Sequence, residues 1–277
     1  MSNRYSFEFF PPKTEAGREK LKDTRSQLAA LNPEFFSVTY GAGGSTRDNT
    51  RGIVLETKKA GLSVAPHLSF GGDDESDILE LLNSYKDAGI DRIVALRGDI
   101  PSGMGATRLV YARELVEFIR KHTGDHFQLE VAAYPEIHPD AKSYDADISF
   151  LKDKLDAGAN SAITQYFFSA DSYFYFLEAC DKAGIDKPIY PGIMPITNYN
   201  NLARFSRNCG AEIPRWLSKK LEGYSDDQQS IIDFGTEFVT ELCHILMEGG
   251  APGIHFYSMN QVEPIKSIAE AVMQSHP

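Results

Sequence analysis

A single carboxylate stands among aromatic residues near the start of the chain, in the segment Ser6-Phe7-Glu8-Phe9-Phe10-Pro11-Pro12. An unpaired carboxylate in apolar surroundings is costly to bury, or its pKa rises so that the group stays neutral. Glu8 therefore either points to water from an edge strand or serves as a carboxylic acid in a site. This segment alone leaves both interpretations open.

Polar residues also stand at the ends of the other apolar, strand-like segments. They are Thr39, His67, Arg97 with Asp99, Tyr134 with Glu136 and His138, Gln165, and Tyr257 with Asn260. In a barrel of parallel strands, catalytic groups gather at the carboxyl ends of the strands. A protein with a purely structural role has no need for such a set, so the pattern predicts an enzyme.

Each of these residues has a simpler structural interpretation when it is taken alone. His67 could be a core histidine with satisfied hydrogen bonds, Thr39 an ordinary β-branched strand residue, and Asp99 the cap of a turn. Gln165 is harder to explain in this way, because an amide within an apolar segment must find hydrogen-bond partners. The argument for a site therefore depends on the whole set.

Two other kinds of chemistry have weaker support. His67, Glu136 and His138 could supply metal ligands, but no HExxH pattern is present and a divalent site needs three or four convergent ligands. A metal-dependent barrel hydrolase or aldolase is therefore the less favoured alternative. No GxSxG segment points to a nucleophilic serine, and no Walker A loop is present.

The elements that must position these residues alternate regularly between strand-like and helical patterns. Expected strands cover Arg4–Phe10, Phe35–Tyr40, Leu62–Phe70, Asp91–Asp99, Phe127–Glu136, Ser161–Phe168, Pro188–Pro195 and Gly253–Ser258. Expected helices cover Thr14–Leu31, Asp48–Ala60, Ser76–Ala88, Leu109–Lys121, Ala146–Ala157, Ser172–Ala183, Asn200–Asn208, Ile213–Leu221, Gln228–Glu248 and Gln261–Gln274. Such alternation is typical of parallel strands joined by crossover helices.

About eight strand–helix units within roughly 250 residues match the size of a (β/α)8 barrel. We therefore predict an α/β protein with a (β/α)8 TIM-barrel fold and a single domain spanning residues 1–277. A doubly wound open sheet is the competing fold, but it calls for a glycine-rich fingerprint after the first strand. Pro11 and Pro12 stand there instead, and neither offers a backbone amide to a pyrophosphate.

Composition narrows the classes of partner and the compartment. The formal net charge of −11 disfavours a general binder of nucleic acid or of anionic membranes. Cys180, Cys209 and Cys243 form no CxxC pair and fit a reducing compartment. No signal peptide and no apolar run of about 20 residues is visible. We therefore expect a cytoplasmic protein without nucleic-acid or membrane partners.

Read together, the strand-end motifs closely resemble those of the 5,10-methylenetetrahydrofolate reductase family, in its bacterial single-domain form. The motifs are FEFFPPK (Phe7–Lys13), SVTYGAGGS (Ser37–Ser45), APHL (Ala65–Leu68), ALRGD (Ala95–Asp99), AAYPEIHPDAKS (Ala132–Ser143), DAGAN (Asp156–Asn160), AITQYFF (Ala162–Phe168) and PGIMPI (Pro191–Ile196). The resemblance implies a flavoprotein barrel that binds FAD and takes electrons from NADH or NADPH. Its expected substrate is methylenetetrahydrofolate and its product 5-methyltetrahydrofolate. It also implies a chain without the C-terminal regulatory domain of eukaryotic members, and leaves a homo-oligomer open.

The resemblance assigns roles to individual positions. Glu8 matches the family's general acid, Asp99 an aspartate beside flavin and folate, and Gln165 a glutamine that contacts the pterin. Phe205 matches a phenylalanine that stacks on the substrate, and Asn201 a folate-contacting position. The expected flavin-site positions are Thr39, His67, Arg97, Gly98, Asp99, Tyr111, Ala112, Tyr134, His138, Asp147 and Lys154.

Three positions depart from the family pattern. Gln261 replaces an arginine implicated in the folate site, and Phe150 and Asp153 stand where well-known bacterial members carry Asn and Arg. Contacts to the folate and to the distal part of FAD are therefore expected to differ. The departures also keep a second class of function open, a barrel retained as a ligand-binding module after loss of catalysis. The presence of Glu8, Asp99 and Gln165 argues against it.

The mechanism implied by the resemblance needs a proton donor with a pKa near neutrality. Protonation of a bridging nitrogen opens the five-membered ring of the substrate to an iminium cation, which accepts hydride readily. Glu8 would supply this proton as general acid, with its pKa raised by its phenylalanine neighbours. Asp99 would stabilise the cation. Nicotinamide and folate would use one flavin face in turn, which predicts ping-pong kinetics.

Overall fold

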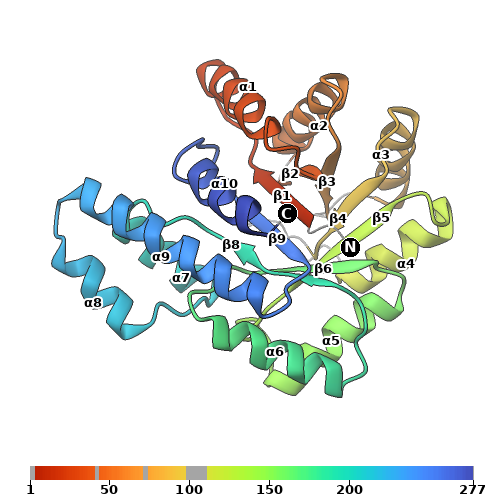
Figure 1. Cartoon of the computed structure of the whole chain (residues 1–277). Coiled ribbons are helices and arrows are strands. Elements are labelled where there is room, and N and C mark those ends of the chain that lie inside the picture. The colour runs from red at the N-terminus through yellow and green to blue at the C-terminus, as the bar shows by residue number, and fades with distance from the viewer. Residues whose placement is uncertain (1–3, 41–43, 71–73, 98–110, 277) are drawn as a thin grey trace.

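Parallel strands form the centre of the molecule. The structure, a computed structural model, describes residues 4–40, 44–70, 74–97 and 111–276 (Figure 1). The strands of these residues join in one sheet in the order β7-β6-β5-β4-β3-β2-β1-β9-β8, and every pairing is parallel. Their bounds are β1 Arg4–Phe9, β2 Phe35–Val38, β3 Val64–Leu68, β4 Arg92–Ala95, β5 Gln128–Ala133, β6 Ser161–Thr164, β7 Ile189–Tyr190, β8 Gly192–Ile193 and β9 Gly253–Tyr257.

The sheet closes into a barrel because β7 and β8 are two halves of one strand position. Pro191 separates them, and proline has no backbone N–H to give to a ladder. β7 pairs with β6 on one side, β8 pairs with β9 on the other, and the Pro191 carbonyl accepts a hydrogen bond from the His255 N–H at 3.0 Å. The predicted (β/α)8 barrel is confirmed, with its seventh strand split at a proline.

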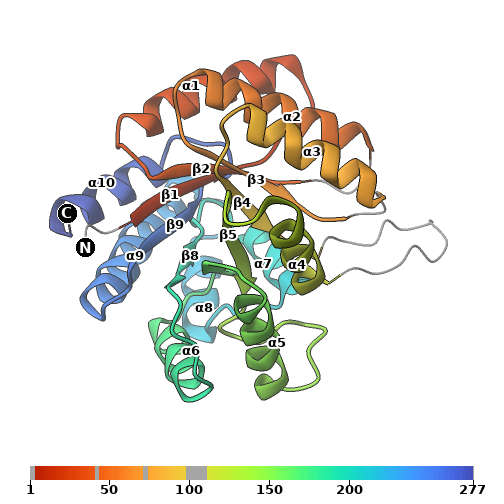
Figure 2. The same cartoon turned by 90° about the vertical axis from the view of Figure 1, so that its right-hand side faces the viewer.

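Helices surround the strands on all sides (Figures 1 and 2). They are α1 Glu15–Ala29, α2 Gly44–Lys59, α3 Glu75–Asp87, α4 Ala112–Thr123, α5 Tyr144–Asp156, α6 Ala170–Lys182, α7 Tyr199–Cys209, α8 Arg215–Gly223, α9 Gln228–Glu248 and α10 Ile265–Ser275. The starts of α2 and α10 differ most from the prediction: α2 begins at Gly44 instead of Asp48, and α10 at Ile265 instead of Gln261. The segment before α10 cannot be helical, since Met259 and Asn260 have a positive φ.

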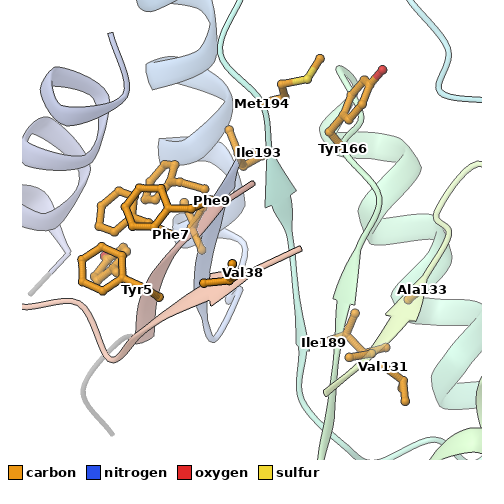
Figure 3. Packing of buried hydrophobic residues seen from close by; sticks show 14 of the residues in the cluster. Tyr5, Phe7, Phe9, Val38, Val131, Ala133, Tyr166, Ile189, Ile193 and Met194 are labelled. Carbon is orange, nitrogen blue, oxygen red and sulfur yellow. The ribbon is translucent and has the colours of Figure 1, made fainter. Parts of the chain in front are cut away.

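The alternation of β1 separates its aromatic rings from its carboxylate. Phe7 and Phe9 are fully buried in the layer between sheet and helices, where they stack with Phe36. Figure 3 shows the rings of Tyr5, Phe7 and Phe9 together on one side of the strand. Because successive strand residues point to opposite faces, Glu8 faces the barrel interior instead.

An ion-pair cluster fills the amino-terminal end of the barrel. Glu130, which is fully buried, places Oε1 2.6 Å from Arg4 Nη2 and 2.5 Å from Arg92 Nη1. The two guanidinium groups also lie over aromatic rings: Arg4 over Tyr190 at 3.8 Å and Arg92 over Phe35 at 4.6 Å from the ring centres. Because this cluster occupies the amino-terminal end of the barrel, we expect a ligand to enter at the carboxyl ends of the strands.

The start of β1 and the end of α10 lie near each other at the closed end of the barrel (Figure 2). The Tyr5 hydroxyl donates a 2.6 Å hydrogen bond to the backbone carbonyl of His276, which ties the start of β1 to the end of α10. Among the helices that the structure describes, none combines the length and hydropathy needed to cross a membrane.

Candidate active site

Two adjoining cavities open at the carboxyl ends of the strands. The mouth cavity, of about 740 Å³, contains Glu8 and is also lined by residues of β3, β4, β5, β6 and β9. The outer cavity, of about 960 Å³, lies between β4, β5, α4 and α5. The two share part of their lining, namely Tyr40, Leu96, Arg97, Ala132, Tyr134, His138 and Asp140. They are therefore continuous, and one long ligand could occupy both.

Glu8 lies between two histidines at the base of the mouth cavity. Its Oε2 atom is 3.2 Å from His67 Nε2 and 3.5 Å from His255 Nε2, and the Ser37 hydroxyl donates to it at 3.5 Å. Neither histidine Nε2 is aligned for a hydrogen bond with any described residue, although both atoms are buried. Two buried ring nitrogens with unmet hydrogen-bonding capacity therefore border the carboxylate.

The expected rise in the pKa of Glu8 is wrong for this arrangement. Burial does raise its pKa, but the charge of His67 and the contact with His255 outweigh that effect and lower the pKa to about 2. The prediction failed because it placed phenylalanine rings around the carboxylate, whereas Phe7 and Phe9 occupy the opposite face of the strand. Histidines from neighbouring strands surround it instead.

Ser6 and His255 extend the polar chain away from Glu8. The Ser6 hydroxyl lies 2.7 Å from His255 Nδ1, on the far side of the ring from Glu8. The register of β1 and β9, which pairs Ser6 with His255, brings them together. Burial lowers the pKa of His255, which favours its neutral form. The sequence analysis named neither residue as a candidate. The pattern could have indicated both, because Ser6 lies two positions before Glu8 and His255 two positions before Tyr257, on the same strand face.

The mouth cavity brings together several other expected site residues. Thr39, Gln165 and Phe205 line it with Glu8 and His67. The side-chain carbonyl of Gln165 accepts a 3.0 Å hydrogen bond from the next residue's backbone N–H, which fixes the orientation of the amide.

The outer cavity collects expected flavin-site residues from β4, β5, α4 and α5. It is lined by Arg97, Tyr111, Ala112, Tyr134, His138, Asp147 and Lys154. Arg97 pairs with Asp140 at 2.9 Å, and Asp147 accepts a 2.8 Å hydrogen bond from the His138 N–H. These expected flavin-site residues therefore lie together in one wall, and their role in cofactor binding stays a prediction.

Lys154 tests whether the outer cavity suits a phosphate-bearing cofactor. Its ammonium group donates a 2.5 Å hydrogen bond to the Ala132 carbonyl, and burial lowers its pKa to about 8. No ion pair to Lys154 occurs among the described residues. Burial destabilises this ammonium and the charge of Asp147 offsets that only in part, so an incoming phosphate would stabilise it further and the donor set fits a nucleotide cofactor.

Two of the three residues that depart from the family pattern also belong to this wall. Phe150 and Asp153 line the outer cavity, and Phe150 and Tyr111 each leave 57% of their surface exposed. Two accessible aromatic rings in one cavity can pack against the flat face of a base.

Some expected residues are not brought to the cavities. Asn201 and Gln261 are exposed and line neither of them. Asp99 and Gly98 lie outside the described residues. Glu136 accepts hydrogen bonds from the Ser172 hydroxyl at 3.1 Å and the Glu212 N–H at 2.8 Å, and it also lines neither cavity. In the part of the chain that the structure covers, no three His, Cys, Asp or Glu side chains gather as metal ligands.

The closed barrel, with its acid–histidine cluster at the mouth and the outer cavity beside it, defines an enzyme of the (β/α)8-barrel class. Within that class the chain belongs to the methylenetetrahydrofolate reductase family, whose pattern it matches over residues 1–273. It is thus an oxidoreductase.

Relatives come from bacteria and plants. The chain is 41% identical over 259 residues to the 5,10-methylenetetrahydrofolate reductases of Pectobacterium carotovorum subsp. carotovorum and of Escherichia coli (strain K12), covering 93% of this chain and 86% of each relative. It is 37% identical over 271 residues to methylenetetrahydrofolate reductase (NADH) 1 of Arabidopsis thaliana, covering 92% of this chain and 46% of the plant protein.

Solved structures support the fold. One, described as an uncharacterized protein from Clostridium thermocellum that binds two copies of 5-methyl-5,6,7,8-tetrahydrofolic acid, superposes with a TM-score of 0.70 and 19% identity. It covers 99% of this chain and 96% of its own. At this identity the likeness concerns the fold alone.

Proposed function

We propose that this protein reduces 5,10-methylenetetrahydrofolate to 5-methyltetrahydrofolate, with FAD as cofactor and NADH as electron donor. The observation that carries the proposal is the position of Glu8, which faces a ligand-sized mouth between two histidines and beside the outer cavity that contains Arg97 and Lys154. The family of the chain supports the same reaction. The name of the plant relative supports NADH over NADPH, as does the absence of an obvious 2′-phosphate cluster from this acidic sequence.

The outer cavity supplies the groups that would hold the cofactor. Arg97 and Lys154 would bind its phosphates, and Tyr111 and Phe150 would pack against its adenine ring. Bound FAD supplies the hydride chemistry, while the protein sets position and electrostatics. Because Phe150 and Asp153 stand in this wall, charge contributes less to cofactor binding here than packing does.

Glu8 would deliver the proton that opens the bridged ring of the substrate. At the 3.2 Å separation of Glu8 Oε2 and His67 Nε2, one proton can move between carboxylate and imidazole. A folate that covers the mouth excludes water, and desolvation then favours the neutral carboxylic acid over the carboxylate. The proton passes from the histidine side to Glu8 and on to the bridging nitrogen.

Gln165 and Phe205 would orient the substrate over the mouth. The amide of Gln165, held by its bond to the following N–H, can donate to the pterin, and the ring of Phe205 can pack against a flat ligand face. Nicotinamide would use the same opening before folate does, which implies ping-pong kinetics.

The test separates the two half-reactions by anaerobic stopped-flow spectroscopy. The purified protein should carry FAD, or bind it on reconstitution. Glu8→Gln should then accept electrons from NADH at near the wild-type rate, while its oxidation by methylenetetrahydrofolate slows by at least about a hundredfold, since general acid catalysis contributes that much. Folate-dependent oxidation within a few-fold of wild type would show that Glu8 is not the acid.

Two further measurements separate the alternative functions. NADH oxidation with menadione as acceptor should proceed in the wild-type protein; a protein that binds ligands but oxidises no NADH would support the binding-module alternative. A protein that no FAD can reconstitute and that retains stoichiometric metal would point to metal-dependent chemistry.

A further inference from the structure

A short turn after β9 holds Phe10, the residue that follows β1, through both its backbone N–H and its backbone carbonyl. The side-chain carbonyl of Asn260 accepts from the Phe10 N–H at 3.0 Å, and its amide donates to the Phe10 carbonyl at 2.7 Å. In the same turn the Ser258 hydroxyl donates to the Glu8 carbonyl at 2.5 Å. We call residues 258–260 the β1 clamp.

The clamp replaces backbone pairing where the ladder stops. β9 ends at Tyr257, which pairs with Glu8, so no strand residue of β9 lies opposite Phe10. Pro11 and Pro12 follow and have no N–H to offer. The Asn260 side chain satisfies both backbone groups of Phe10, as a neighbouring strand residue would do.

The clamp has a backbone conformation that is unfavourable for its side chains. Met259 and Asn260 both have a φ of 54°, in the left-handed region. Asparagine tolerates this region, whereas methionine rarely adopts it. The turn is held by hydrogen bonds from the Asn260 N–H to the Ser258 hydroxyl at 3.2 Å and from the Gln261 N–H to the Ser258 carbonyl at 3.0 Å. Strain that surrounding contacts maintain is common at functional sites.

We propose that Asn260 is a positioning residue for proton transfer by Glu8: its side chain fixes the end of β1, so that the carboxylate stays opposite His67. The inference rests on the proposed function, in which Glu8 is the acid. Only Phe9 separates Glu8 from the clamped Phe10, so movement of that end moves the carboxylate. A misplacement of about 1 Å can cost on the order of a hundredfold in rate.

The groups that face Glu8 come from three other strands. They are Ser37 on β2, His67 on β3, and His255 and Tyr257 on β9. β1 pairs directly with β2 and β9 but not with β3, so the contact with His67 crosses the barrel mouth. This contact is the most sensitive to displacement of β1.

The decisive variant is Asn260→Gly, since glycine adopts the left-handed conformation freely and only the side-chain clamp is lost. Its oxidation by methylenetetrahydrofolate should slow by at least about tenfold, and the pH profile of that half-reaction should shift upward. Reduction by NADH should remain within about twofold of wild type. Tyr5→Phe is the matched control, because it removes one hydrogen bond at the opposite end of β1, and it should behave as wild type in both half-reactions.

A second readout does not depend on turnover. Carboxyl ¹³C NMR, with the Glu8 signal assigned through Glu8→Gln, should show a higher pKa for Glu8 in Asn260→Gly than in wild type or Tyr5→Phe. Identical Glu8 titration in all three proteins would overturn the positioning role, even if wild type proved unable to reduce the folate. If the Glu8 titration shifts in Asn260→Gly but the wild-type protein cannot reduce folate, the proposed function would be overturned and the clamp kept. Equal folate rates in Asn260→Gly and wild type would also overturn the inference.

Discussion

At the scale of single residues, the chemistry depends on which side chains surround Glu8. Two histidines and a serine hydroxyl lie within 3.5 Å of its Oε2 atom. Burial would raise the pKa of Glu8, and the charge of His67 does most to reverse that effect. We therefore expect Glu8 and His67 to share one proton. His255 contacts the same carboxylate and lies next to the Ser6 hydroxyl.

His67→Gln should raise the pKa of Glu8 from about 2, because the glutamine keeps polar contact but carries no charge. Carboxyl NMR titration measures the shift, and His122→Gln, on α4 and outside both cavities, is the control. The variant's folate half-reaction should also become more sensitive to rising pH, since the proton is no longer shared with an imidazole. An unchanged Glu8 titration would contradict the role of His67.

At the scale of elements, Gly192 of β8 allows the backbone of β6 and the ring of Tyr257 to approach closely at the mouth. A Cβ on Gly192 of β8 would lie 2.1 Å from the Thr164 carbonyl oxygen and 2.7 Å from the ring of Tyr257. Tyr257 in turn donates to that carbonyl at 2.7 Å. The split strand β7–β8 can therefore close the barrel only with a residue that has no side chain at this position.

Gly192→Ala should lower the free energy of unfolding by about 1–3 kcal/mol, since the backbone must shift to admit the methyl group. Urea denaturation followed by circular dichroism measures it. Gly223→Ala, at the end of α8 with open space around the Cβ, is the control and should be neutral or stabilising by up to about 1 kcal/mol. Equal stability of the two variants would show that the close approach is relieved without cost.

At the scale of the whole molecule, the ion cluster of Arg4, Arg92 and Glu130 closes one end of the barrel and leaves the other for ligands. Burial opposes the charge of Glu130, but its two arginine partners outweigh that effect and lower its pKa. Its contribution to stability is therefore complete above the ordinary value of 4.5 and is lost as the pH falls toward the lower folded value.

Glu130→Gln should cost about 3–5 kcal/mol at neutral pH, because it leaves two largely buried guanidinium groups with only the more exposed Glu34 as their anion. The difference from wild type should shrink as the pH falls below 4.5. Glu34→Gln is the control: this more exposed partner of the same arginines should contribute less than about 1 kcal/mol. Denaturant unfolding at several pH values measures both differences. An equal loss of unfolding free energy in Glu130→Gln and Glu34→Gln would contradict the argument.

Local patterns in the sequence determined the barrel and the order of its elements, whereas the residues of the outer-cavity wall were suggested by the motifs shared with the reductase family. Strand and helix periodicity are short-range properties, and the polar residues at strand ends identify the mouth without any knowledge of contacts. The alternation of Phe7, Glu8 and Phe9 even implies opposite faces. Only the tertiary structure decided which face is the interior, that His67 and His255 meet at Glu8, and that Asn260 holds Phe10. These contacts join strands far apart in the chain. The sign of a pKa shift depends on such neighbours, and the aromatic residues next to Glu8 in sequence are not its neighbours in space.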